Sequence, residues 1–188
     1  SNIGSIVVDK LGYAHAQSPS SFAVSNCTVG STGTAAPQVA LSISGSPSAF
    51  DISVSDSSLL ATEQALLLGG LGTGTTLTVT RSRLSVAMAE KTPLGNDDFA
   101  ALHVSEVLGN TKIDLVDSSF TVANPLQLTG DLGNAAAVSI AAASSTHAVT
   151  SVTGCSLLVA TNGRTWGLRY GTANSAACLA VVNTTVAT

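Results

Sequence analysis

The chain has 188 residues, of which 45% are hydrophobic, 10% are charged and 4% are aromatic, and its formal net charge is −4. This aliphatic, weakly charged composition excludes a disordered chain, and it provides no basic surface for nucleic acid. No apolar run reaches about 18 residues, so no transmembrane span is expected in this segment. The first ten residues lack the charged and apolar regions of a signal peptide, so in a secreted protein that signal would lie outside residues 1–188.

Residues 1–20 are expected to be a lead-in to the main fold. Within them, the stretch SIVVDK at residues 5–10 predicts a partial first rung anchored on Asp9, with Val7 facing inward. The rest of this segment fits no pattern found later in the chain.

From residue 21 to residue 188, one ten-residue pattern recurs. Apolar residues stand at its first, third and eighth positions, with Thr150 as the exception in the first. Six segments carry the pattern: FAVSNCTVGS (22–31), ISVSDSSLLA (52–61), LTVTRSRLSV (77–86), IDLVDSSFTV (113–122), TSVTGCSLLV (150–159) and LAVVNTTVAT (179–188).

The fifth position of each segment, which we call the anchor, predicts a bend. Apolar residues two apart share one face of a strand, and the change from even spacing before the anchor to odd spacing after it turns the chain through a corner. Asn, Asp and Gly adopt left-handed backbone angles at the least cost. The anchors are Asn26, Asp56, Arg81, Asp117, Gly154 and Asn183. The pattern gives no reason for an arginine at the third of them.

A third strand precedes each bend at a nearly constant distance. Leu41, Leu66, Leu102 and Leu168 each lie eleven residues before the first apolar residue of the following segment. Val138 lies twelve residues before Thr150, and we assign the extra residue to the AAA run between them. An antiparallel sandwich would show hairpin signals at short spacing, and period-2 alternation excludes a helical solenoid. The sequence therefore predicts an all-β fold, a parallel β-helix (β-solenoid) of about six rungs with three strands per rung.

Neither end of the predicted solenoid carries a capping helix or a polar closing strand. An uncapped β-helix exposes strand edges on which the strands of another rung can pair. We therefore expect residues 21–188 to be a segment of a longer solenoid, or to stack end to end on copies of the chain.

The connection that follows each bend varies in length, and its two long forms span residues 87–101 and 123–137. Variable loops on a rigid scaffold often carry recognition, although they also mark a corner where insertions are tolerated. The candidate recognition-loop residues are Glu90, Lys91, Asp97, Asp98 and Asp131.

The chain contains only weak candidates for catalytic or metal-binding residues. Asp97 and Asp98 lack the further oxygen ligands that calcium requires. Asp56 and Asp117 share a column but lie two rungs apart, and both are explained as bend formers. His103 lies between two inward-facing residues, so we expect it to point outward into solvent. The chain is not predicted to be an enzyme, and no catalytic residue, metal or cofactor is expected.

The cysteines predict no disulfide. Cys27 and Cys155 follow their anchors directly but lie four rungs apart, about 19 Å at the strand spacing, so we interpret them as small space-filling residues. Two sequons, Asn26-Cys27-Thr28 and Asn183-Thr184-Thr185, make Asn26 and Asn183 candidate N-glycosylation sites in a secreted protein. The bend alone also explains both asparagines.

The phrases VSNCTV, VSDSSL, VDSSF, VTGCSLLV and VVNTTV, separated by ALxLxG-like strands, carry a resemblance over residues 21–188. They resemble the very large surface proteins of kinetoplastid protists, in particular the dispersed gene family proteins of trypanosomes and related free-living bodonids. Bacterial β-helix adhesins are also similar. The resemblance implies an extracellular, glycosylated, adhesin-like or coat-forming protein, and it carries over no functional residue.

Two hypotheses of different classes follow. The first is an extracellular structural or adhesive β-solenoid that forms part of a surface layer or filament by end-to-end β stacking. Its partners would be copies of itself or further rungs of the same chain, and glycans or a cell surface. The alternative is a carbohydrate-binding or polysaccharide-degrading β-helix protein.

Overall fold

A computed structural model of the chain describes residues 2–8, 20–31, 36–45, 47–89, 99–127, 133–143, 147–172 and 178–188. All regular structure in these residues is β, and its 19 strands form three parallel sheets. The predicted parallel β-helix of about six rungs with three strands per rung is confirmed. No helix in the described part of the chain is long and apolar enough to cross a membrane.

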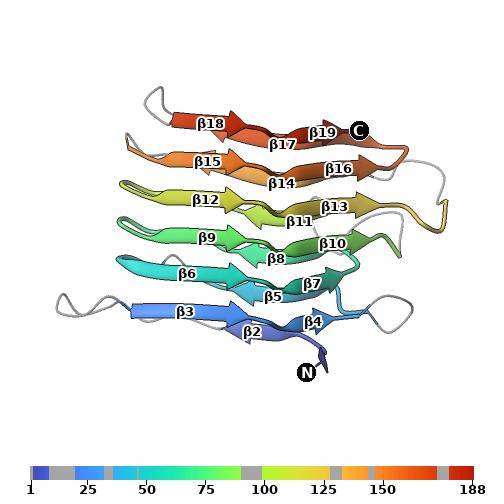
Figure 1. The fold of residues 1–188 in the computed structure, drawn as a ribbon, viewed down its shortest axis with the longest axis horizontal. Helices are drawn as coiled ribbons and strands as arrows, with labels where there is room; N and C mark the ends of the chain where they lie inside the picture. Colours follow the sequence, from blue (N-terminus) through green and yellow to red (C-terminus); the bar gives the residue numbers. More distant parts are fainter. Residues whose placement is uncertain are drawn as a thin grey trace.

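The three sheets extend along the axis on which the rungs stack, and each rung contributes one strand to each sheet (Figure 1). We call this stack of rungs the rod. Sheet A contains β1 (Asn2–Ile3), β4 (Thr28–Gly30), β7 (Ser58–Ala61), β10 (Arg83–Ala87), β13 (Ser119–Ala123), β16 (Ser156–Ala160) and β19 (Thr185–Ala187). Sheet B contains β2 (Ile6–Val8), β5 (Val39–Ile43), β8 (Gln64–Leu68), β11 (Phe99–Val104), β14 (Asn134–Ala143) and β17 (Arg164–Thr172). Sheet C contains β3 (Ser20–Ser25), β6 (Phe50–Ser55), β9 (Thr76–Thr80), β12 (Lys112–Val116), β15 (Val149–Thr153) and β18 (Cys178–Val182).

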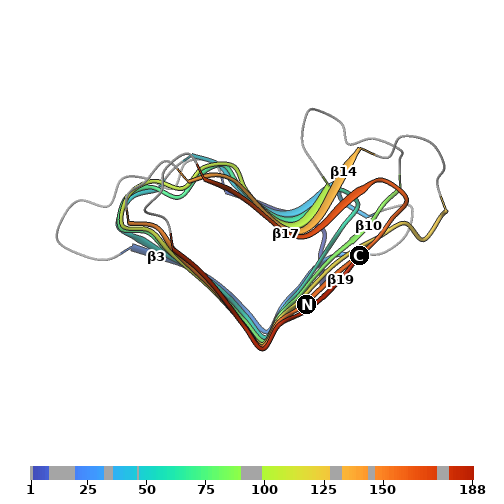
Figure 2. The ribbon, with the colours of Figure 1, turned by 90° about the horizontal axis from the view of Figure 1, so that it is seen from above.

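Viewed along the rod, the coil has two straight sides that meet at a narrow corner (Figure 2). These sides are sheets C and A, and sheet B closes the third side. Side chains alternate in and out along the straight sides, so that Ile52 and Val54 of β6 are buried while Ser53 and Ser55, which alternate with them, are partly exposed. Burying a large aliphatic side chain contributes about 1.5–3 kcal/mol, and each inward position repeats this gain on every rung.

Sheet B dips toward the interior along its middle (Figure 2). The strand pairing skips one position per rung there, and the skipped residues are all buried: Ala40, Ala65, Ala101, Ala137 and Gly167. A Cβ on Gly167 would lie only 2.1 Å from Cγ1 of Val186, an inward residue of β19. The dip brings sheet B so close to sheet A that this column accepts only very small side chains.

A second bend precedes sheet C. Ala49, Gly74 and Asn110 have φ values of 52°, 76° and 53° and occupy the same place on successive rungs. Buried Thr75 and Thr111 follow them, and their hydroxyls donate to the carbonyl oxygens of earlier turns, at 2.5 Å from Thr75 to Pro47 and 3.1 Å from Thr111 to Gly72. The sequence pattern did not predict this corner.

The extra residue of the fifth rung lies where it was expected. The pairing of β14 with β17 shifts between Ile140 and Ala143, so the alanine run absorbs it. Thr150 is the one polar residue at the first, otherwise apolar, position of the pattern. It is buried, and its hydroxyl donates a 3.5 Å hydrogen bond to the phenol oxygen of Tyr170, which explains the exception.

The prediction that Val7 faces inward is wrong. Ile6–Val8 form β2 of sheet B, in which Ile6 and Val8 pair with Leu41 and Ile43. The predicted anchor, Asp9, lies outside the described residues. Ile6 and Val8 therefore pack against the core, and Val7 between them is 66% exposed.

The prediction that His103 is solvated is also wrong. Its side chain does leave the core, since it lies between inward Leu102 and Val104, but it is only 6% exposed. Every residue of β11 is buried, as is Ser139, its neighbour on β14. The middle of sheet B is therefore covered on both faces, a property that alternation along one strand does not reveal.

Candidate functional site

The narrow corner between sheets C and A is built on six left-handed residues. The six anchors have positive φ: Asn26 (52°), Asp56 (50°), Arg81 (46°), Asp117 (48°), Gly154 (64°) and Asn183 (48°). The predicted bend is confirmed on every rung, including the one with arginine. Because left-handed angles reverse the phase of the strand, apolar residues point inward on both sides of the corner.

A ladder of buried hydroxyls follows the anchors. Ser57, Ser82 and Ser118 each stand directly after an anchor and are at most 5% exposed. The N–H of Ser57 donates to Oγ of Ser82 at 3.2 Å, and the N–H of Ser82 donates to Oγ of Ser118 at 3.1 Å. Each of these hydroxyls also donates to the carbonyl of the residue two places earlier, at 2.7–2.9 Å. The ladder satisfies backbone groups that the bend removes from the sheets.

Cys27 and Cys155 occupy the same ladder, which accounts for their position more fully than space filling does. Their thiols point to the carbonyl oxygens of Ser25 and Thr153, at 3.1 and 3.4 Å, and the Cys27 N–H donates to Oγ of Ser57. Burial raises the pKa of the Cys155 thiol. Cys27, Cys155 and Cys178 are free.

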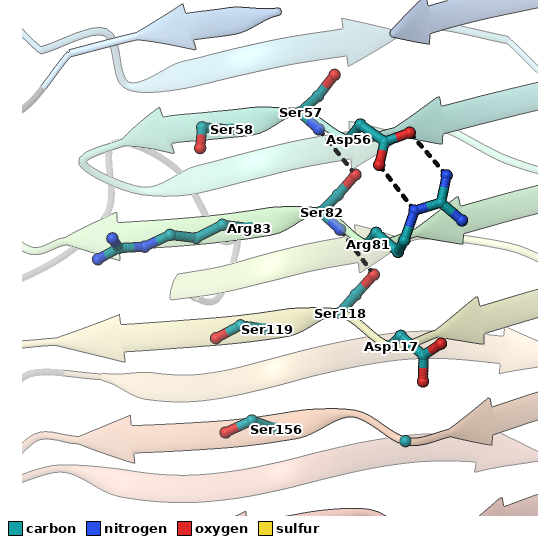
Figure 3. A pocket seen from close by; sticks show the side chains of 11 residues that line it. Asp56, Ser57, Ser58, Arg81, Ser82, Arg83, Asp117, Ser118, Ser119 and Ser156 are labelled. Carbon is teal, nitrogen blue, oxygen red and sulfur yellow. Dashed lines mark hydrogen bonds and ion pairs between the residues drawn. The ribbon is translucent and has the colours of Figure 1, made fainter. Parts of the chain in front are cut away.

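Arg81 and Asp56 form an exposed ion pair along the outside of the corner (Figure 3). Nε and the second guanidinium nitrogen of Arg81 each donate to one carboxylate oxygen of Asp56, both at 2.8 Å. These hydrogen bonds hold the pKa of Asp56 below its ordinary value of 3.8 and raise that of Arg81. Asp56, the ion-pair partner on the preceding rung, explains why an arginine is found at this anchor.

Asp117 leans toward the empty space at Gly154. A Cβ on Gly154 would lie 2.3 Å from Oδ1 of Asp117. Gly154 therefore serves two purposes, since it adopts the left-handed angle and leaves room for the neighbouring carboxylate.

An open depression of about 580 Å³ runs beside these anchors, across β7, β10, β13 and β16 (Figure 3). We call it the corner trough. Its lining is entirely polar apart from Gly154: Asp56, Ser57, Ser58, Arg81, Ser82, Arg83, Asp117, Ser118, Ser119 and Ser156. The anchors Asp56, Arg81 and Asp117 lie along one side of it, and Arg83 extends away from them (Figure 3).

One column of the trough presents polar groups outward. Arg83 pairs in register with Ser58 and with Ser119, and Ser119 pairs with Ser156. Arg83 is exposed and makes no ion pair within the described residues, and no hydrogen bond joins these serine hydroxyls to other trough residues (Figure 3). The column therefore offers one guanidinium and three hydroxyls to a ligand.

The candidate recognition-loop residues Glu90, Lys91, Asp97, Asp98 and Asp131 lie outside the described residues. Asn26 and Asn183 are exposed on the outside of the narrow corner, five rungs apart in the anchor column. Their glycosylation stays a prediction.

Acidic groups are spread out along the rod. In the described residues, no three His, Cys, Asp or Glu side chains gather closely enough to hold a metal ion. Asp56 and Asp117 share a column, as expected, but Arg81 lies between them and engages Asp56.

Sequence reasoning missed the corner trough, although the aligned segments contain a signal for it. The position after each anchor is always Ser, Cys or Thr, and the next position is Ser, Thr or Arg. The first regularity indicates a buried hydrogen-bonding column, and the second indicates the outward column that contains Arg83.

Comparison with known proteins adds no relative. No protein-family model matches the chain, and neither a curated protein nor a solved structure matches it.

The hydroxyl ladder predicts a sharp difference between two serines. Ser82→Ala removes the acceptor of the buried Ser57 N–H, so we expect it to lower the free energy of unfolding by about 1–3 kcal/mol. Ser119→Ala, on the outer face of the same corner, should change it by no more than about 0.5 kcal/mol. Denaturant unfolding of both variants measures the difference, and equal effects would contradict the ladder.

The ion pair predicts a pH dependence at Asp56. Its pKa is below the ordinary 3.8, so the pair stabilises the fold above that pH, and the contribution disappears as the pH falls through the lowered pKa. A carboxyl titration by NMR should give a pKa below 3.8 in the wild type and a value closer to 3.8 in Arg81→Met. An unchanged titration in the variant would mean that the pair does not persist in solution.

Proposed function

We propose that this chain is part of a structural β-solenoid of an extracellular or cell-surface layer, in which a further rung, from the same protein or from a copy of it, pairs with the rung formed by β17, β18 and β19. The observation that carries the proposal is the exposure of inward positions on the last rung. Leu179, Val181 and Val186 are 40%, 46% and 53% exposed. Their equivalents one rung earlier, Thr150, Val152 and Leu157, are at most 1% exposed.

The end also offers unpaired backbone groups. β17, β18 and β19 are the outermost strands of their sheets at this end, and each has a neighbour on one side only. An exposed strand edge with apolar side chains beside it is a template for another strand. A further rung would pair with these edges and cover the three apolar side chains together.

Geometry limits how a second copy can add. The coil repeats the order B, C, A, and β19 belongs to sheet A, so the next strand to be added belongs to sheet B. A copy that continues the coil places its β2 on β17 and its β3 on β18. Its β1, which lies in sheet A before β2, would then occupy the place of β19, so β1 must leave its pairing with β4.

The extracellular setting and the adhesive role rest on composition and on the resemblance to kinetoplastid surface proteins. The outward positions of the rod are mostly small and polar, as in Ser53, Thr78 and Ser151 of sheet C. A rigid rod with such a surface suits a layer or filament whose contacts lie at its ends and corners.

Glycan binding is the second candidate function, and the corner trough is the observation that favours it. Its polar lining and its unpaired Arg83 suit a hydroxyl-rich ligand. The trough lies on the side of the rod, so this function is compatible with stacking at the end.

Stacking is tested by two lysine substitutions at adjacent residues. Val181 faces the interior and Val182 faces outward, with similar exposures of 46% and 50%. We expect Val181→Lys to abolish assembly, because it places a charge in the stacked core, and Val182→Lys to preserve it. Electron microscopy and sedimentation at rising concentration measure assembly.

The wild type should form fibres with an axial spacing near 4.8 Å, the distance between paired strands. A variant lacking residues 1–4 should assemble at a lower concentration, since it has no β1 to displace. A wild-type chain that stays monomeric in both forms, or fibres that tolerate Val181→Lys, would refute end-to-end stacking.

A further inference from the structure

We propose that the corner trough binds an acidic glycan, with Arg83 holding an anionic group of a sugar and the serines beside it contacting the sugar hydroxyls. This inference rests on the second candidate function, glycan binding, and adds the class of glycan. It is independent of the structural role, because the trough lies on the flank of the rod and remains open whether or not further rungs are added. It assigns a ligand class to the residues that the corner pattern places outside the core.

Of the two arginines that line the trough, Arg81 already has an ion-pair partner and, within the described part of the chain, Arg83 does not. Asp56 occupies the guanidinium of Arg81 through two hydrogen bonds, so this pair is largely neutralised. Arg83 has no such partner among the described residues and extends away from the ion pair (Figure 3). A guanidinium of this kind binds carboxylate or sulfate through two parallel hydrogen bonds.

The hydroxyl column explains why the ligand is a sugar. Ser58, Arg83, Ser119 and Ser156 lie in one column on four successive strands, which span about 14 Å at the strand spacing of ~4.8 Å. Serine hydroxyls both donate and accept, as sugar hydroxyls do, and the buried ladder beneath holds the strands rigidly in place. A ligand with hydroxyls on both sides of its anionic group can use the serines above and below Arg83.

An acidic peptide fits the trough less well. Peptides are recognised through an exposed strand edge or through apolar pockets, and acidic motifs are recognised by clusters of arginines. The trough has no such cluster, because Arg81 is paired with Asp56 and only Arg83 remains. The strands beneath the trough are paired on both sides, and the lining contains no apolar side chain. The trough therefore offers a peptide neither backbone pairing nor anchoring pockets.

Asp117 makes the two ends of the trough electrostatically different. Its carboxylate leans toward Gly154 at the β16 end, away from the ion-paired Asp56. An anionic group is repelled at that end and attracted at Arg83. Replacing Asp117 by Asn should therefore strengthen the binding of an acidic sugar.

Titration calorimetry of the full chain tests the proposal with three probes: an oligogalacturonate, a sulfated dextran oligosaccharide and neutral dextran. We expect the first or the second to bind and neutral dextran not to bind, and the stronger of the two identifies the anionic group. Because one charge-assisted bidentate contact is lost, Arg83→Ala should weaken binding about tenfold or more. Arg83→Lys should weaken it less, since it keeps the charge and loses the planar pair of donors.

Arg164→Ala is the matched control, because it removes an exposed arginine from β17 on another side of the rod. It should change affinity less than about twofold if binding is local and not a general effect of net charge. NMR shift changes on binding should centre on Arg83, Ser119 and Ser58.

Three results would overturn the proposal. They are no binding of either acidic probe, an affinity that Arg83→Ala leaves unchanged, and equal binding of a polyglutamate peptide at the same residues. A variant that no longer folds is recognised by its unfolding transition, and Arg83→Lys then carries the test. The test of stacking is independent of this one, because the stacking variants lie at the end of the rod and not in the trough.

Discussion

The left-handed residue at the narrow corner is the constraint on which the rest of this structure depends. A strand that continued without it would turn all the apolar side chains of its second half to the outside. One residue with φ near 50° restores the phase, so that two straight strands present apolar side chains to the same interior. Because this occurs on every rung at the same place, the rungs stack in register and the core columns form.

The corner has a cost that the stacked rungs offset together. Left-handed angles cost a residue other than glycine about 1–2 kcal/mol, less for Asn and Asp. The bend also removes backbone groups from the sheets, and the serines after the anchors bond to them again. Each serine depends on its neighbours in the rungs above and below, so an isolated corner would lack this compensation. The corner is therefore stable only as part of a stack.

The corner also determines which surfaces remain for function. Anchor side chains project outward because their backbone turns, so charged residues are accepted there without entering the core. Arg81, the least expected anchor, is held by Asp56 of the rung before it. The same geometry places Arg83 and its serine neighbours in an outward column beside the anchors, which creates the corner trough.

Much of the fold was predictable because it depends on spacing within one chain segment. The anchors, the inward columns and the third strand all follow from the positions of apolar residues relative to Asp117 and its equivalents. The dip of sheet B was not predictable in this way, because Ala101 is small on account of the distance between two sheets. His103 was misplaced for a related reason, since alternation gives the direction of a side chain and not what covers it. The trough was not predicted because it depends on Arg83 together with Ser58 and Ser119 of the neighbouring rungs, which no single strand shows.

The most direct test of this account compares glycine with valine at two positions of one rung. At Asp117, where φ is 48°, the account predicts that the glycine variant is more stable than the valine variant by about 1–2 kcal/mol, because a β-branched residue is strained there. At Thr121, within strand β13, the order should reverse, because valine favours an extended strand. Denaturant unfolding of the four variants measures both differences. If valine were as stable as glycine at Asp117, the left-handed corner would not be the feature that holds the coil in phase.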